Sequence, residues 1–288
     1  IMGHEASGII EATGSEVKNW KTGDRVTFDS TVYPLDDWFT LEGRYNLSDN
    51  REVLGVSPGD YRRNGAFAEL LAVPQHILYR IPDSVTYEQA AMVEAAAVAL
   101  HAVNISGMKT GDSCVVTGAG MIGIFVIKLL GIAGSGRIIV IDNDPAKLAG
   151  AIKSGAVNIF DPSDNNLVGK IKDLTSSRGA DISFEAVGKS ETVNTAISVS
   201  RKGGTVVLIG NSVKVIELPL QKVVTGELKI LGSCAIRGEY EVILKLMKDK
   251  RLTVDDQISA IAPLSEGADW FRKLYNKEGN LNKVILIP

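Results

Sequence analysis

The sequence Gly118-Ala119-Gly120-Met121-Ile122-Gly123 decides the fold of this 288-residue chain. An apolar run before it, Ser113–Thr117, predicts a buried strand, and a helical pattern follows from about residue 122 to 133. In such a unit Gly118 permits a tight turn, Gly120 lets the backbone approach a pyrophosphate, and Gly123 lets the helix pack on the strand. We therefore predict a Rossmann-type dinucleotide site. The alternative is a glycine turn in an α/β sheet that binds nothing.

An acidic residue after the next predicted strand selects the form of the dinucleotide. Arg137–Ile141 reads as that strand, and Asp142 closes it. A carboxylate there accepts hydrogen bonds from both hydroxyls of the adenosine ribose and repels a 2′-phosphate. Asp144 is the better cap for the helix predicted to begin at Pro145, so Asp142 is expected to be free. No arginine follows to accommodate NADP, and NAD is predicted.

Some of the other candidate cofactor-binding residues lie at the start of the helix after the glycine turn. Its unpaired N–H groups and the positive end of its dipole favour phosphates. These further candidates are Met121, Ile122, Asn143, Lys147, Val187 and Gly210.

From Thr86 onwards, short apolar runs alternate with helical patterns. The first helix is expected from Thr86 to His101, and another from Pro145 to Gly155. This alternation predicts parallel βαβ units and an α/β fold with a doubly wound sheet. Further strands are expected at Ile182–Glu185, Thr205–Ile209 and Lys229–Ile236, then helices at Glu239–Lys250 and Glu266–Asn276 around the loop Pro263-Leu264, and a last strand at Lys283–Ile287.

The first 90 residues follow another pattern. Short β-like runs at residues 8–11, 24–28 and 67–73 are closed by turn residues, which predicts a small antiparallel barrel or sandwich. Between Ser30 and Gly65 the periodicity fails, and such a long excursion is usually functional.

Composition excludes several function classes. A net charge of −3 provides no basic field for a nucleic acid, so no nucleic-acid partner is expected. No apolar run is long enough to span a membrane, and the N-terminus lacks the features of a signal peptide. Cys114 and Cys234, both placed in strands of the Rossmann sheet, do not form a disulfide framework, which favours a reducing cytoplasm.

Several motifs together resemble the medium-chain, zinc-type alcohol and polyol dehydrogenases over essentially the whole chain. They are Gly3-His4-Glu5-Ala6-Ser7-Gly8, Gly14, Val17, Gly23-Asp24-Arg25-Val26, Gly65-Ala66-Phe67-Ala68-Glu69, the glycine turn and Gly203-Gly204-Thr205. The resemblance implies a GroES-like catalytic domain with the Rossmann domain inserted in it and the active site in the cleft between them. The implied divisions are residues 1–94, 95–236 and 237–288.

The resemblance also implies a catalytic zinc. His4 matches a zinc ligand, and Glu5 is its neighbour in the site, sometimes a ligand and sometimes behind one. Glu94 matches the position where polyol dehydrogenases carry a zinc-associated glutamate and alcohol dehydrogenases a cysteine, which favours the polyol branch. His76 and His101 have no such support, and we expect a surface histidine and a packing histidine.

Two departures from the family pattern stand out. The family carries a Cys ligand and a relay hydroxyl in a segment before the His-Glu pair, whereas this sequence begins at Ile1, so weaker zinc binding and slow turnover are expected. The four cysteine positions of the family's structural zinc hold Pro34, Asp37, Thr40 and Ser48. No thiolate site can form there, and structural zinc is predicted to be absent.

The predicted function is NAD-dependent oxidation of a secondary alcohol, with a small-molecule polyol or sugar alcohol as the substrate. Two alternatives remain open: an NAD-binding protein that has lost catalysis, and a zinc-independent reductase. The resemblance further implies a homodimer or homotetramer, in which a strand such as Lys229–Ile236 pairs across a two-fold axis.

Overall fold

The structure, a computed structural model, describes residues 1–56 and 63–288 and divides into two compact units. The first unit comprises Ile1–Ala97 and Ala235–Pro288, and the second comprises Val98–Cys234. The helix α3 (Val93–Ile105) contains the first point of division. The domain limits expected from the sequence, after residues 94 and 236, lie close to these points.

The second unit is built on a six-stranded parallel sheet with the order β11-β10-β9-β6-β7-β8. This order reverses between β6 and β9, as in a doubly wound dinucleotide-binding fold. The strands are β6 (Ser113–Thr117), β7 (Arg137–Ile141), β8 (Asn158–Phe160), β9 (Ala180–Glu185), β10 (Ser200–Leu208) and β11 (Lys229–Gly232). β11 ends earlier than expected, so Cys234 lies outside the sheet, whereas Cys114 lies in β6.

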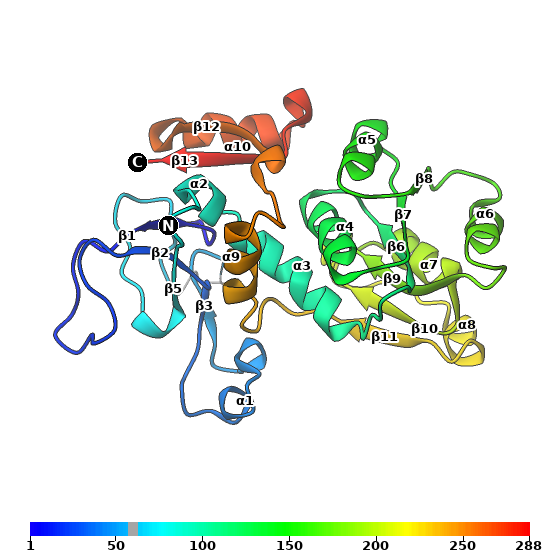
Figure 1. The fold of residues 1–288 in the computed structure, drawn as a ribbon, viewed down its shortest axis with the longest axis horizontal. Helices are drawn as coiled ribbons and strands as arrows, with labels where there is room; N and C mark the ends of the chain where they lie inside the picture. Colours follow the sequence, from blue (N-terminus) through cyan, green and yellow to red (C-terminus); the bar gives the residue numbers. More distant parts are fainter. Residues whose placement is uncertain (57–62) are drawn as a thin grey trace. The chain divides into compact units, whose positions relative to one another are not determined.

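Helices pack on this sheet, as Figure 1 shows in green and yellow. α4 contacts β6 and β7, α5 contacts β7 and β8, and α7 contacts β6, β9 and β10. Their apolar faces bury side chains against strands that are themselves apolar, which is the pattern of a parallel sheet covered by helices. The helices are α4 (Met121–Ala133), α5 (Pro145–Lys153), α6 (Leu167–Leu174), α7 (Ser190–Val199) and α8 (Leu220–Thr225).

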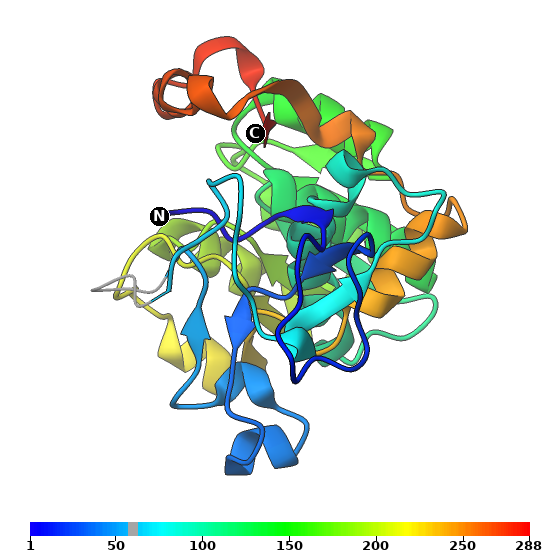
Figure 2. The same ribbon diagram turned by 90° about the vertical axis from the view of Figure 1, so that its left-hand side faces the viewer.

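The first unit contains three small sheets, which Figure 2 shows from a second direction. β1, β2 and β5 form an antiparallel sheet, β3 pairs with β4, and β12 pairs with β13 in parallel. The bounds are β1 (Ser7–Ile9), β2 (Arg25–Phe28), β3 (Thr31–Val32), β4 (Glu52–Val53), β5 (Leu78–Arg80), β12 (Ile258–Pro263) and β13 (Lys283–Ile287). The prediction of a strand at residues 67–73 is wrong, because this run forms bends and irregular backbone, and Leu70 is exposed.

Helices of the first unit are short. The helix expected from Thr86 to His101 is two helices, because the turn at residues 91–92 separates α2 from α3. Thr86 starts α2 with a reciprocal capping box to Gln89, in which each side chain bonds the other residue's backbone N–H. The remaining helices are α1 (Trp38–Leu41), α2 (Tyr87–Ala90), α9 (Tyr240–Lys248) and α10 (Gly267–Tyr275), with 3-10 turns at Tyr45–Leu47, Gln75–Ile77, Asp255–Gln257, Leu264–Glu266 and Glu278–Asn280.

The long excursion between Ser30 and Gly65 has short elements of its own, namely β3, α1, a 3-10 turn and β4. Residues 57–62 of this stretch lie outside the described residues. Its inner side packs in a small apolar core with Val32 and Leu54, so the excursion is an ordered lobe of the first unit where it is described.

Two further expectations concern the cysteines and membrane-spanning helices. Cys114 and Cys234 are not joined in a disulfide. In the described part of the chain, no helix combines the length and the apolar character needed to cross a bilayer.

Candidate functional site

Three of the predicted site residues come together in the first unit. One ligand-type atom each from His4, Glu5 and Glu94 lies within 4.8 Å of the other two. His4 and Glu5 precede β1, whereas Glu94 lies in the first turn of α3, ninety residues further along the chain. The structure thus assembles the group that the resemblance implied.

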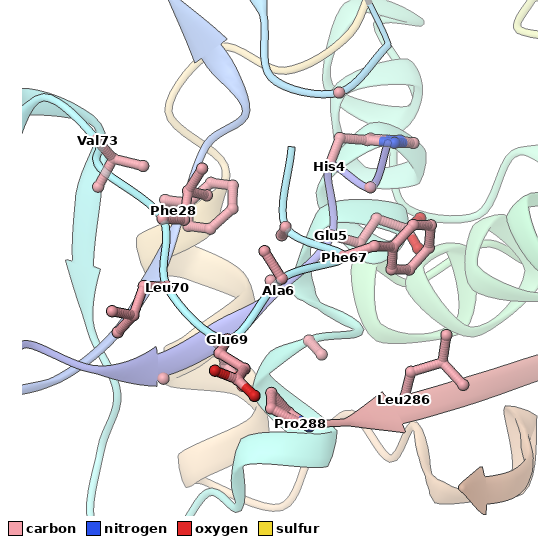
Figure 3. A pocket seen from close by; sticks show the side chains of 18 of the residues that line it. His4, Glu5, Ala6, Phe28, Phe67, Glu69, Leu70, Val73, Leu286 and Pro288 are labelled. Carbon is pink, nitrogen blue, oxygen red and sulfur yellow. The ribbon is translucent and has the colours of Figure 1, made fainter. Parts of the chain in front are cut away.

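Backbone pairing fixes the run that carries His4 and Glu5. Three amides of the segment 65–67 donate to the carbonyls of residues 1–3: Gly65 N to Ile1 O at 2.9 Å, Ala66 N to Gly3 O at 2.8 Å and Phe67 N to Met2 O at 2.9 Å. Figure 3 shows His4 and Glu5 on this run, with Phe67 beside Glu5. They line a hollow of about 1230 Å³ within the first unit.

A lysine lies next to the group. Lys283, the first residue of β13, forms an ion pair with the Glu5 carboxylate, and both side chains are mostly buried. Burial, and then the charge of Lys283, lower the pKa of His4. The neutral imidazole is the form that binds metals, so His4 is in its ligand form at neutral pH.

Glu94 is the least compensated carboxyl of the group. Its side chain is 12% exposed, and its ion-pair contact is to His4, with Glu94 Oε1 3.9 Å from His4 Nε2. Burial, and then the charge of Asp29, raise the pKa of Glu94 to about 8. Asp29 is itself buried, and it accepts hydrogen bonds from Thr31 N at 2.9 Å and from Tyr45 Oη at 2.7 Å. A cation placed between His4 and Glu94 would favour the ionised carboxylate.

These residues fit a zinc ion by their chemistry and spacing. Zinc binds imidazole nitrogen and carboxylate oxygen at about 2.0–2.2 Å, so two ligand atoms on one ion lie at most about 4.4 Å apart. The 3.9 Å between His4 and Glu94 meets this limit. Among residues 1–56 and 63–288, no second group of three His, Cys, Asp or Glu side chains has metal-binding spacing.

The positions of the family's structural zinc form a hydrogen-bonded cap instead. Asp37 is the N-cap of α1 and accepts from Thr40 N at 2.7 Å. The Ser48 hydroxyl donates to the other carboxylate oxygen of Asp37. These hydrogen bonds hold the pKa of Asp37 below its usual value. Three of the four positions are therefore linked to one another without a thiol, while Pro34 precedes the cap.

The glycine turn of the second unit connects β6 to α4. A Cβ added at Gly123 would lie 1.9 Å from the carbonyl oxygen of Gly118, so only glycine lets the helix pack so closely on the turn. Gly120 is the N-cap of α4 without a side-chain cap, and the first N–H groups of the helix, from Met121 and Ile122, begin there. A helix start of this kind is suited to an anion.

Asp142 is not free, contrary to the expectation from its sequence position. Its side chain accepts from Ala119 N at 2.7 Å and from Asp144 N at 2.9 Å, and the residue is 9% exposed. Asp144 caps α5 as expected, accepting from Ala146 N at 2.8 Å. The backbone turns bring these amides within reach of Asp142, which ties the glycine turn to the end of β7. A carboxylate has about four lone-pair sites, so acceptor capacity for ribose hydroxyls remains.

The other candidate cofactor residues lie in three places. Asn143 and Lys147 are exposed, before and within the first turns of α5. Val187 follows β9, and its side chain approaches Gly118 so closely that a Cβ on that glycine would be 2.5 Å away. Gly210 follows β10 and packs against residues 187–188.

Sequence reasoning missed three functional candidates and misplaced one histidine. Lys283 and Asp29 carried no local signal, because their relation to the group arises from long-range packing. Glu185, an acid at the end of a buried strand, could have been found by the rule that found Asp142. His76, expected at the surface, is half-buried: its ring packs edge-on against Tyr33 and burial lowers its pKa.

Comparisons with known proteins were made with both the sequence and the fold. Residues 1–83 match the family model described as alcohol dehydrogenase GroES-like domain, and residues 121–249 match the model described as zinc-binding dehydrogenase. The first segment contains His4 and Glu5, and the second contains all of α4, the helix that follows the glycine turn.

Individual proteins are similar over the whole chain. Sorbitol dehydrogenase of Bacillus subtilis is 30% identical, with 100% of this chain and 81% of the relative covered. The (R,R)-butanediol dehydrogenase of the same organism is 34% identical, with 100% and 80% covered. A solved zinc-binding dehydrogenase from Sinorhizobium meliloti, bound to NADP, has a TM-score of 0.90 at 29% identity, with 100% and 83% covered.

The raised pKa of Glu94 predicts how stability depends on pH in chelator-treated protein. The pKa of this carboxyl is raised from the ordinary 4.5 to about 8 in the folded protein, so between these values the folded state binds more protons than the unfolded state. The free energy of unfolding should then fall as pH rises, by up to about 1.4 kcal/mol per pH unit. Glu94→Gln removes this contribution.

Urea denaturation at several pH values between 5 and 8 measures this difference. Wild type should lose stability relative to Glu94→Gln as pH rises, and added zinc should reverse the loss in wild type alone. Parallel pH curves for the two proteins would show that Glu94 ionises normally.

Proposed function

The chain belongs to the zinc-type medium-chain polyol dehydrogenase family, and on this premise we propose that it oxidises a secondary alcohol of a polyol with NAD. Family members are NAD(P)-dependent oxidoreductases that act on secondary alcohols. The observation that carries the proposal is the group of His4, Glu5 and Glu94, because it supplies nitrogen and carboxylate ligands in one place. No observation favours a non-catalytic binding protein or a zinc-independent reductase.

We propose that His4 and Glu94 hold the catalytic zinc. Zinc bound there polarises the substrate oxygen and stabilises the negative charge that develops on it. His4 is held neutral by burial and by Lys283, so its nitrogen is open to a metal. Glu94 releases its proton when a cation binds. Glu5, held by Lys283, remains beside these two ligands rather than turning away from them.

We propose that the glycine turn and Asp142 hold NAD. Bound NAD would supply the hydride acceptor for the substrate carbon, and the residues of the chain would orient it. Amides at the start of α4 are suited to the pyrophosphate, and the carboxylate of Asp142 to the adenosine ribose. The same carboxylate, kept in place by two backbone amides, disfavours the extra phosphate of NADP. Relatives differ here, since the Sinorhizobium protein was solved with NADP.

We also propose a homodimer or homotetramer in the cytoplasm. β11 is an end strand of the six-stranded sheet, so one of its edges is open to a second copy. Nearby apolar side chains are exposed, with Val215 at 84% and Val224 at 67%. The cytoplasmic location is supported by the two cysteines, which are not joined in a disulfide.

Cofactor preference tests the role of Asp142. Wild type should bind NADH more tightly than NADPH, by about tenfold or more, because a repelled phosphate costs at least as much as one charge-assisted hydrogen bond. Asp142→Asn should narrow this ratio, because it removes the charge but keeps one acceptor oxygen. NADH binding should weaken, and NADPH binding should strengthen. Asp144→Asn is the matched control and should leave the ratio unchanged. Fluorescence titration of the three proteins with each cofactor measures all six affinities, and equal binding of both cofactors to wild type contradicts the assignment.

Zinc-dependent polyol oxidation tests the proposed reaction. Sorbitol, xylitol and (R,R)-butanediol should reduce NAD in the presence of the protein, with at most one zinc per chain by elemental analysis. His4→Ala should lose the zinc and lower kcat/KM by about a hundredfold or more, because several kcal/mol of charge stabilisation are removed. Glu11→Gln, an exposed acid in the same unit, should retain both. Activity of His4→Ala without zinc would refute the metal assignment.

Light scattering tests the assembly. The mass should be two or four times the 30.8 kDa of one chain. Val215→Glu places a charge among the exposed apolar residues near β11 and should shift the mass toward the monomer. Val157→Glu, 64% exposed beside β8 at the opposite end of the sheet, should not. A monomer in wild type contradicts the proposal.

A further inference from the structure

Glu185 is a buried acid that neither the metal group nor the glycine turn uses. It is the last residue of β9 and is 0% exposed. Burying a carboxylate is costly unless hydrogen bonds compensate it. The bonds that Glu185 makes therefore indicate what its burial organises.

The side chain of Glu185 holds the loop that follows it. Its Oε1 atom accepts from Val187 N at 2.9 Å and from Gly188 N at 2.8 Å. A single carboxylate oxygen thereby fixes two consecutive amides. Because the Val187 side chain lies against Gly118, the same loop is also packed on the glycine turn.

The main chain of Glu185 holds a second loop. Its carbonyl oxygen accepts from Ile209 N at 2.8 Å and from Gly210 N at 3.0 Å, directly after β10. The two loops are in backbone contact, because a Cβ on Gly210 would lie 2.1 Å from Gly188 N. One residue therefore sets the loops that follow both β9 and β10.

The strand order shows which half of a dinucleotide these loops serve. A dinucleotide binds across the point where the order reverses, at the carboxyl ends of the strands. That point lies between β6 and β9. Asp142, on the β6–β8 side, is placed for the adenosine half, so the loops after β9 and β10 are placed for the other half.

We propose that Glu185 is a positioning residue for the nicotinamide half of the cofactor. It acts through the loops carrying Val187 and Gly210 and does not touch the cofactor, since its carboxylate is enclosed. The inference rests on the proposed NAD-dependent function and adds a residue that this function needs. A purely structural carboxylate would weaken the binding of both halves of the cofactor together.

The test measures the affinities of NADH and of AMP, by fluorescence and by calorimetry. Glu185→Ala leaves two amides without their acceptor and should weaken NADH binding by about tenfold or more. AMP carries only the adenosine half, and its affinity should stay within about twofold of wild type on the same reasoning. Gly210→Ala displaces the same loops from the other side and should give the same pattern.

A conservative variant and a matched control complete the design. Glu185→Gln keeps an acceptor oxygen for the two amides. Its NH₂ group can donate toward Thr117 Oγ1, a buried acceptor without a partner at the register position paired with Glu185, so NADH affinity should be largely restored. Asp181→Asn removes a hydrogen-bonded carboxylate at the opposite end of β9 and should change neither affinity.

The outcomes separate the inference from the proposed function. If wild type binds no NADH, the proposed function fails. If wild type binds NADH and Glu185→Ala binds it equally well, or loses NADH and AMP in parallel, the positioning role is wrong. If Glu185→Ala does not fold, the affinities of Gly210→Ala and Glu185→Gln for NADH and AMP decide whether the positioning role is right or wrong.

Discussion

Burying a carboxyl group under protein is costly, and the two candidate centres depend on how that cost is met. Asp142 follows β7 and accepts from Ala119 N of the glycine turn and from Asp144 N of the turn after it. Glu185 ends β9, and its Oε1 atom accepts from Val187 N and Gly188 N of the turn that follows, while its Oε2 atom is buried without a hydrogen-bond partner. Those amides are available only when the turns adopt one conformation. The buried charge therefore specifies the loops around the cofactor as strongly as the glycines do.

Glu94 shows the opposite case. Asp29, its buried neighbour, accepts hydrogen bonds from an amide and a tyrosine hydroxyl, whereas the described residues give Glu94 only the distant contact to His4. An acid in such surroundings keeps its proton unless a cation arrives, and its pKa of about 8 reflects this. The protein thus has one uncompensated buried carboxyl at the place where we propose that zinc binds.

The sequence predicted the elements whose signals are local. The glycine turn, the acid after β7 and the alternation of strands and helices follow from short-range patterns, and the last strand was located at its observed bounds. Prediction failed where long-range packing decides. Residues 67–73 look like a strand but form an irregular segment, of which Phe67, with Gly65 and Ala66 before it, pairs with residues 1–3. The ion pair between Lys283 and Glu5 joins two segments far apart in the chain. The state of Asp142 depended on turn geometry, which composition does not encode.

The cap built from Asp37, Thr40 and Ser48 has a consequence for the conditions under which the excursion lobe survives. A lobe held by four thiolates around zinc comes apart when oxidants form disulfides or when chelators remove the metal. Hydrogen bonds from a hydroxyl and an amide respond to neither. Because the pKa of Asp37 is lowered, the pH must fall below the usual pKa of an aspartate before Asp37 is protonated. The cap of Asp37, Thr40 and Ser48 therefore contains no group on which chelation or thiol oxidation acts.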